Sequence, residues 1–190
     1  MTNPRTAFYK KINELLLKLV AKLPEPRSSV PSATQETLIK TASLKAAAIS
    51  GALSIPAGVL AALTLLPDIV AVWKIQAQLV ADIAAANGKS KQLSRETLLY
   101  CMFGVDAMAT EDLVVRVSQR FVVKRSSQKI FESLLGKLGL RIGRSLLGER
   151  LVRWVPFVGA ALVARYSYND TVKVGKTARE LFSQLMVTEN

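Results

Sequence analysis

The longest stretch without a charged side chain runs from Ala46 to Pro67, and nearly all of its residues are apolar or small. A helix that spans a bilayer needs about 20 predominantly apolar residues, so this length suits a membrane as well as the buried centre of a helical bundle. Pro56 stands near the middle of the stretch, and proline breaks or kinks a helix interior. The pattern therefore predicts a proline-broken apolar helical hairpin, with its environment left open.

Small residues recur at every fourth position along this stretch, which places them on one face of a helix. Such a ridge lets a second helix approach closely, and a GxxxG step later in the chain has the same property. We expect close helix packing at Ser50, Ser54, Gly58, Ala62, Gly139 and Gly143.

An amphipathic basic helix is predicted for residues 5–22, because leucines recur at helical spacing among lysines. The helix either docks its leucines on the rest of the protein or lies on anionic lipid. The prolines of residues 24–33 mark a linker after it. We therefore divide the chain into a leader helix with its linker, 1–31, and a helical domain, 32–190.

Helix start signals continue through this domain. Ser32 and Gln35 have capping-box spacing, so a helix is expected to begin near Ala33. Pro67 followed by Asp68 is typical of a first helical turn, and we expect a third helix to open there. Asp68 would then cap that helix or pair with an arginine, in preference to a proton or ion role.

The second half of the chain predicts further helices. Asn87-Gly88 is a natural helix end, and Ser94 is the expected cap of a short buried helix over 96–107. From Thr110 the alternation of apolar and basic residues favours a basic helical region with a break near Ser126-Ser127.

A last helix is expected from Pro156 towards Val187, packed against the apolar hairpin. Aromatic residues make up only 6% of the chain, which favours close helix packing over a β-sandwich. The expected fold is a single all-α helical bundle of five to seven helices with the proline-broken hairpin inside it.

The formal net charge of +12 is unevenly distributed. Residues 113–157 carry ten Lys or Arg against two Asp or Glu, whereas 46–112 is slightly acidic. A surface of one sign suits an anionic partner, either phospholipid or nucleic acid. The expected membrane or partner contacts are Lys10, Lys11, Lys18, Lys22, Arg116, Arg120, Lys124, Lys137, Arg141 and Arg144.

Nucleic-acid binding is the alternative from a different class of function. It rests on segment 113–157, where Phe121, Phe131 and Trp154 stand among the cations. Aromatic residues at helical spacing more often belong to a core.

The sequence contains few of the residue types that usually serve in catalysis or bind metal ions. The chain has no histidine, so the commonest general base and imidazole metal sites are missing. Cys101 is the single cysteine and lies in an apolar run, which favours a buried small hydrophobe. We expect no enzyme activity, no metal and no cofactor.

Three features in order are the LPDI step at Leu66 to Ile69, a helix closed by Asn87-Gly88, and VPFVGAALVARYSYND from Val155 to Asp170. Together they resemble the EcsC family of bacterial proteins over about residues 40–182. The resemblance implies a helical protein linked to an ABC-transporter operon and to protein secretion, with no chemistry assigned to its motif positions. Those positions here are Pro67, Asp68, Pro156, Gly159 and Ala160.

The sequence thus predicts a non-enzymatic membrane-side accessory or interaction protein, linked to transport or secretion. It would bind anionic lipid or a membrane protein through a basic surface and the apolar hairpin. No unbroken apolar core with a small-residue cleavage site follows the first cations, so we expect no secretion signal. The expected location is cytoplasmic, peripheral or hairpin-inserted at the inner face of the cytoplasmic membrane, with oligomerisation left open.

Overall fold

A computed structural model describes residues 4–27, 34–53, 59–107, 114–117, 120–123, 126–148 and 158–185. Within these ranges the chain is an all-α bundle, which confirms the predicted fold class. The helices are α1 (Pro4–Ala21), α2 (Gln35–Leu53), α3 (Val59–Ala86), α4 (Arg95–Ala107), α5 (Gln128–Gly148) and α6 (Val158–Gln184), with a short 3-10 turn η2 (Ser90–Gln92). One antiparallel hairpin, β1 (Val114–Val117) and β2 (Arg120–Val123), stands between α4 and α5.

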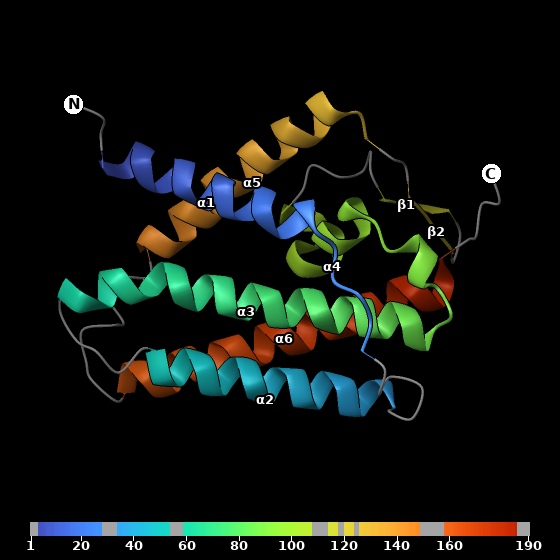
Figure 1. The fold of residues 1–190 in the computed structure, drawn as a ribbon, viewed down its shortest axis with the longest axis horizontal. Coiled ribbons are helices and arrows are strands. Elements are labelled where there is room, and N and C mark those ends of the chain that lie inside the picture. The colour runs from blue at the N-terminus through green and yellow to red at the C-terminus, as the bar shows by residue number, and fades with distance from the viewer. Residues whose placement is uncertain are drawn as a thin grey trace.

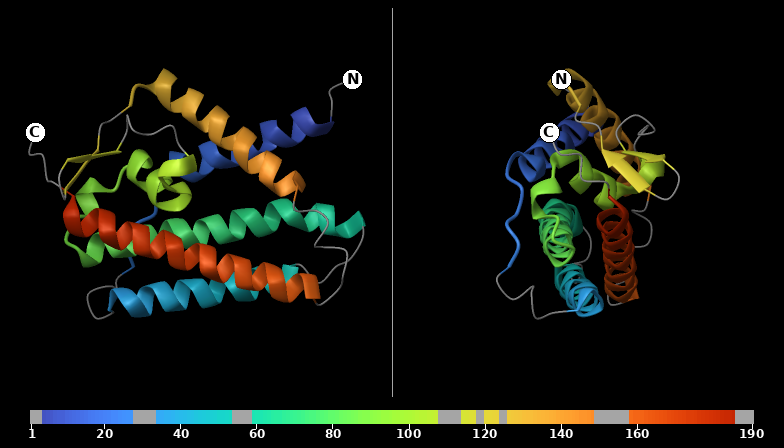
Figure 2. Two further views of the ribbon diagram at one scale, coloured as in Figure 1. Left: turned by 180° about the vertical axis from the view of Figure 1, so that it is seen from behind. Right: turned by 90° about the vertical axis from the view of Figure 1, so that its right-hand side faces the viewer.

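The helices form two layers. Figure 1 shows α1 and α5 crossing at one side of the molecule, and α3, α6 and α2 gathered at the other, with α4 between the two groups. The end-on view in Figure 2 gives the same arrangement. We call the first group the α1–α5 layer and the second group the three-helix bundle. α2 packs along both α3 and α6, and α1 packs mainly on α5.

The apolar hairpin and its contact with the last helix are confirmed. α2 and α3 form its two arms, and α6 lies against both of them. The turn that contains Pro56 lies outside the described residues, as do Ser54 and Gly58. On α2 the ridge of small residues is buried, with Ala46 and Ser50 wholly enclosed.

α2 and α6 approach each other closely at Gly175. A Cβ atom built on Gly175 would lie 2.6 Å from Cγ1 of Ile39. Gly51 lies near Ala164 farther along the same pair of helices, since its added Cβ would be 3.4 Å from the Ala164 Cβ. These contacts fix the register of α6 against α2.

The expectation that a third helix opens at Pro67 is wrong, because α3 begins at Val59 and continues through this proline. One proline removes a single helical hydrogen bond, and the apolar sequence on both sides allows the helix to continue. Asp68 is therefore in a helix interior and does not cap α3. The end of α3 is as expected, since Gly88 has a φ of 67° and the Lys89 N–H donates to the carbonyl of Ala84 at 2.8 Å.

The expected basic helical region after Thr110 is also wrong, because β1 and β2 form a hairpin there in which Val115 pairs with Val122. The reason is local: valine and phenylalanine dominate both strands, and β-branched and aromatic residues favour extended backbone. The break before α5 is confirmed, with Ser127 Oγ accepting a hydrogen bond from the Ile130 N–H at 3.4 Å.

Helix caps follow local sequence closely. Ser94 caps α4 as expected, since its Oγ accepts from the Thr97 N–H at 3.2 Å while Thr97 Oγ1 accepts from the Ser94 N–H at 2.8 Å. At α2 the cap is Thr34, whose Oγ1 accepts from the Thr37 N–H at 3.2 Å. The expected cap Ser32 lies outside the described residues.

Candidate functional site

The α1–α5 layer holds the side chains that the sequence marks for an anionic partner. Ile12 and Leu16 of α1 and Leu135 and Leu138 of α5 are buried in the common core. The lysines of each helix lie away from the arc that these buried residues form, so burial of that arc turns the cations outwards. The leader helix therefore docks through its leucines, in agreement with one of the two expected modes.

The two helices approach each other closely at Gly139. A Cβ added to this residue would overlap Oδ1 of Asn13. Gly139 is one of the residues at which the sequence predicts close packing, and the side-chain environments of Gly143 and Ala62 are not among those described. The Asn13 Oδ1 atom is buried here without a hydrogen-bond partner. The short separation places the outward arcs of α1 and α5 next to each other.

Seven cations lie exposed on this layer, and we call them the basic face. They are Lys10, Lys11, Lys18, Lys22, Lys129, Lys137 and Arg141. Of the layer's described side chains two are carboxylates: Glu14, which pairs with Lys11 at 3.4 Å, and Glu132, which accepts from Gln128 at 2.8 Å. The basic face therefore keeps a large excess of positive charge.

The structure brings together six of the ten expected contact residues and adds Lys129. Arg116 and Arg120 belong to the β-hairpin, and Arg144 lies farther along α5, but their side chains are not described. Lys124 falls outside the described residues. Lys129 belongs to the basic segment 113–157 but is not one of the ten residues that the sequence singled out as contacts.

Three large apolar side chains are exposed among these cations. Leu17 is 42% exposed, Ile130 is 54% exposed and Leu140 is 43% exposed. Leu17 follows the buried Ile12 by five residues, and Leu140 follows the buried Leu135 by the same interval. At about 100° per residue this interval turns each side chain by about 140° from the core direction. The basic face therefore has apolar as well as cationic character.

The linker that follows α1 is fastened to the three-helix bundle. Asp82 of α3 is wholly buried and accepts hydrogen bonds from the Arg27 N–H at 2.9 Å and from Arg27 Nε at 2.7 Å. Gln78 donates to the same carboxylate at 3.0 Å and to the Glu25 carbonyl at 2.8 Å. These contacts fix the position of the chain just after the end of α1.

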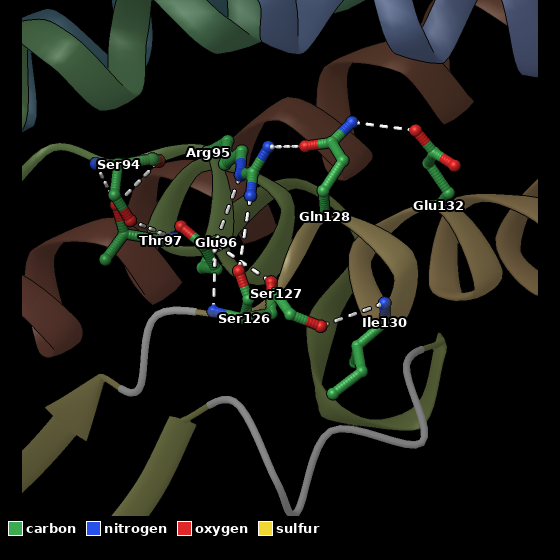
Figure 3. A network of polar contacts seen from close by, with 9 residues as sticks. All are labelled: Ser94, Arg95, Glu96, Thr97, Ser126, Ser127, Gln128, Ile130 and Glu132. Atoms are coloured by element: carbon green, nitrogen blue, oxygen red, sulfur yellow. Dashed lines mark hydrogen bonds and ion pairs between the residues drawn. The ribbon is translucent and has the colours of Figure 1, made fainter.

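A polar network joins α4 to the beginning of α5 (Figure 3). The buried Glu96 accepts from Ser126 Oγ at 3.0 Å and from Arg95 Nε at 3.2 Å. The Arg95 guanidinium lies 4.1 Å from the centre of the Phe131 ring and donates to Gln128 at 2.8 Å. Burial acts to raise the pKa of Glu96, but the hydrogen bonds that it accepts outweigh burial and hold its pKa below the ordinary value. The network fixes the direction in which α5 leaves the β-hairpin.

Asp68, one of the family-motif positions, belongs to a buried polar layer of the three-helix bundle. Ser50 Oγ donates to Asp68 at 2.7 Å, and Ser167 Oγ donates to Ser50 Oγ at 2.8 Å. α2, α3 and α6 each supply one of these residues. Pro67 is exposed on α3, Gly159 and Ala160 lie in the first turn of α6, and Pro156 lies outside the described residues.

A second polar layer lies farther along the bundle. Gln76 Nε2 donates to Asp170 at 2.8 Å and to Thr171 Oγ1 at 3.3 Å. Burial raises the pKa of Asp170, and the bond from Gln76 and the nearby Lys173 oppose that rise only in part. Ser43 of α2 is wholly buried, and its Oγ has no hydrogen-bond partner. Ser43 follows Ile39 by one turn and Thr171 precedes Gly175 by one turn, so the register places them opposite each other.

Catalytic and metal-binding arrangements are not evident in the described part of the chain. No group of three or more His, Cys, Asp or Glu side chains there is placed to hold a metal ion. Cys101 is buried, and burial raises the pKa of its thiol, which disfavours the reactive thiolate. The Gly175-Lys176-Thr177 sequence resembles the end of a nucleotide-binding loop, but it lies inside α6 and not at a turn between a strand and a helix.

One helical stretch among the described residues, Pro67–Ala86, is long and apolar enough to cross a membrane by length and composition. In the folded chain 61% of the apolar window in this stretch is buried. A core helix of a soluble protein passes the same test.

Comparison of the chain with protein-family models, with curated proteins and with solved structures found no match.

Proposed function

We propose that this protein is a non-enzymatic accessory protein of the cytoplasmic side of a membrane, and that it binds anionic phospholipid through the basic face of the α1–α5 layer. The observation that carries the proposal is the packing of α1 on α5, which assembles seven cations from two distant segments on one layer. Two separately basic helices would each be weak membrane ligands. Side by side they act on the same area of lipid.

The magnitude of the electrostatic attraction supports this function. A Lys or Arg near an anionic leaflet contributes about 1 kcal/mol, so several of the seven acting together give useful affinity. The electrostatic attraction decays over about 10 Å at ordinary salt, and over a shorter distance when salt is added, so binding should depend on salt. The protein is then held at the surface while its three-helix bundle stays free for a membrane-protein partner.

The EcsC resemblance adds a context of transport and secretion to this proposal. The LPDI step falls in α3 and the described part of the second motif, from Val158, falls in α6, and these two helices are in contact. Asp68 and Ala160 belong there to the bundle rather than to the basic face. In the proposed protein the motifs therefore maintain the bundle, and the α1–α5 layer makes the lipid contact.

Nucleic acid remains the alternative anionic partner, with less support from the side chains. Phe121 and Phe131 are buried in the core, so neither offers a ring on which a base stacks. Trp154 lies outside the described residues. Among the described residues of this segment, charge is the feature that favours nucleic acid.

Sedimentation with vesicles tests the function directly. We expect the full chain to pellet with vesicles that contain phosphatidylglycerol at low salt, to stay in the supernatant with pure phosphatidylcholine, and to be released by added salt. Changing Lys10, Lys11, Lys18 and Lys22 to glutamine should remove most of the binding. A protein that stays in the supernatant with anionic vesicles at low salt contradicts the proposal.

A matched control separates a specific face from net charge. Lys40, Lys45, Lys173 and Lys176 are exposed on α2 and α6, away from the α1–α5 layer, and their change to glutamine alters the net charge equally. This control variant should bind nearly as well as the unchanged protein. Equal loss in both variants would indicate attraction by overall charge, and a gel shift with random duplex under the same salt would identify nucleic acid as the better ligand.

A further inference from the structure

We infer that the protein meets an anionic bilayer with Leu17, Ile130 and Leu140 in the lipid interface and with the three-helix bundle directed away from it. This inference rests on the proposed function and names the surface that touches the lipid. It also assigns the apolar hairpin of α2 and α3 to the protein core and not to the bilayer.

The first argument is the combination of residue types on the basic face. A surface that only attracts an anion needs cations, whereas a surface that enters the headgroup region also exposes large apolar side chains. Leu17, Ile130 and Leu140 are three of the seven large hydrophobic residues exposed in the described part of the chain. They lie on the same two helices as the cations, so one approach to the membrane satisfies both groups.

The second argument is the spacing of cations and apolar residues along α5. Lys129 directly precedes Ile130, and Lys137 stands three residues before Leu140. Lysine stems can lie along apolar surface while the ammonium group reaches the headgroups, and Lys137 shares a face of α5 with Leu140. Leu17 has Lys18 beside it on α1.

The third argument concerns the other exposed hydrophobic residues. The other four, Leu44, Ile49, Leu162 and Tyr166, lie on α2 and α6 of the three-helix bundle, and α2 is at the side of the molecule opposite α1 and α5 in Figure 1. These two helices also expose six cations, Lys40, Lys45, Arg165, Lys173, Lys176 and Arg179, with the carboxylates Glu36 and Glu180. Insertion of the α2–α3 hairpin would also have to separate α2 from α6, which are in contact along most of α2. The packing therefore keeps the α2–α3 hairpin in the protein core and argues against its insertion in the bilayer.

The lipid surface is preferred over an acidic protein or a nucleic acid because exposed aliphatic side chains gain by burial in the acyl boundary. An acidic soluble polymer offers charge without that boundary. The inferred contact therefore has an electrostatic part that salt weakens and an apolar part that salt does not screen.

Environment-sensitive labels on introduced cysteines test the orientation. Cys101 is buried with a raised thiol pKa, so a thiol-reactive NBD group labels an introduced exposed cysteine selectively. The informative variants are Ile130→Cys and Leu140→Cys. Leu44→Cys is the matched control, because Leu44 and Ile130 are equally exposed at 54%.

With vesicles of phosphatidylglycerol and phosphatidylcholine we expect NBD emission at positions 130 and 140 to rise and shift to the blue, and to be lost when the vesicles contain a nitroxide-labelled lipid. The label at position 44 should keep its emission in water. A soluble polyanion such as heparin should produce no comparable shift at any position.

The possible failures are distinguishable. If none of the labelled proteins pellets with anionic vesicles, the proposed function fails together with this inference. If they pellet and the label at position 44 enters the lipid, or the labels at 130 and 140 remain in water, the inference is overturned while membrane binding stands. If heparin gives the same emission change as vesicles, the face binds polyanions and the inferred lipid contact is wrong.

Discussion

The guanidinium of Arg27 bridges to the carboxylate of Asp82, a residue 55 positions later in the chain and wholly enclosed in the core. The Arg27 backbone N–H donates to the second oxygen of the same carboxylate at 2.9 Å. Arg27 thus supplies both main-chain and side-chain donors to one buried charge. The linker between α1 and α2 is held by this contact, although its prolines suggest a simple spacer.

Replacing Arg27 by alanine should destabilise the fold by about 1–3 kcal/mol, because a buried carboxylate loses its charged donors. Arg27→Lys should recover only part of the loss, since an ammonium group lacks the planar fork of a guanidinium. Urea denaturation measures the change. Lys22→Ala is the control, because Lys22 is exposed and outside this contact; equal midpoints for Arg27→Ala and Lys22→Ala would show that the contact contributes nothing.

Two glycines of similar appearance in the sequence should respond oppositely to alanine. At Gly175 an added Cβ would lie 2.6, 3.1 and 3.2 Å from three atoms of Ile39, a branched side chain within a packed interface. Gly175→Ala should therefore destabilise by about 1–3 kcal/mol through overpacking. At Gly136 an added Cβ meets no atom within 4 Å, so Gly136→Ala should stabilise α5 by about 0.5–1 kcal/mol.

Thermal and urea denaturation of both variants give the comparison. The sign of the change in unfolding free energy is more informative than its size. A loss of stability indicates that close helix packing dominates at that glycine, and a gain indicates that helix propensity dominates. A stabilising Gly175→Ala would mean that α2 and α6 are not in tight contact there.

Local signals account for most of what the sequence predicted correctly. The cap at Ser94, the end of α3 at Gly88 and the start of α5 after Ser127 each depend on a few neighbouring residues. The amphipathic leader helix and the apolar hairpin were likewise predictable, because their patterns extend over several turns.

The errors arose where two local rules competed. Around residue 115 the spacing of valines and arginines is compatible with a helix and with a short strand. The structure has strands there, because β-branched side chains favour extended backbone. At Pro67 the proline looked like a helix start, yet the apolar residues before it continue the same helix. Asp68, which was expected to cap a helix, therefore lies in a buried polar layer with Ser50 and Ser167.

The composition of the basic face was only partly predictable for a different reason. Lys10 and Lys137 are distant in sequence, and only the packing of Asn13 on Gly139 places their helices together. The GxxxG step indicated that α5 has a close neighbour but not which helix it is. Tertiary contact therefore supplies the information that single-sequence periodicity lacks.

The pKa of Glu96 predicts a loss of stability in acid. Its pKa is held below the ordinary carboxyl value in the folded chain, so its contribution is present above the ordinary pKa and is lost as the pH falls through the lowered one. Glu96→Gln should lower stability at neutral pH by about 1–3 kcal/mol and flatten the acid limb of the stability curve. Urea midpoints measured across the acid range provide the test; an unchanged acid limb in the variant would exclude Glu96 as its source.

Asp170 should show the opposite sign. Its pKa is raised by burial, so the folded chain holds this proton more tightly than the unfolded chain does. The contribution of Asp170 is therefore greatest at low pH and declines as the pH rises from the ordinary carboxyl value through the raised one. Asp170→Asn should be at least as stable as the unchanged protein at neutral pH, and it should lose this decline. A variant with a steeper decline would contradict the assignment.

Three buried serines of the bundle allow a test of hydrogen-bond direction. Ser50 Oγ uses its only hydrogen on Asp68, so the bond between Ser50 and Ser167 requires Ser167 to donate. Ser50→Ala removes the donor to a buried carboxylate and should cost about 1–3 kcal/mol. Ser167→Ala leaves the bond from Ser50 to Asp68 in place and should cost less.

Ser43 provides the control on the same helix, because Ser43 and Ser50 are both wholly buried, yet Ser43 Oγ has no hydrogen-bond partner. Ser43→Ala removes an unsatisfied hydroxyl and should be neutral or stabilising. The double variant Ser50→Ala with Ser167→Ala should cost less than the two single changes added together, since the Ser167 bond depends on Ser50. Urea denaturation of the four variants gives the order of stability directly. Equal losses at Ser43 and Ser50 would mean that burial of the hydroxyl, and not its bond to Asp68, determines the effect.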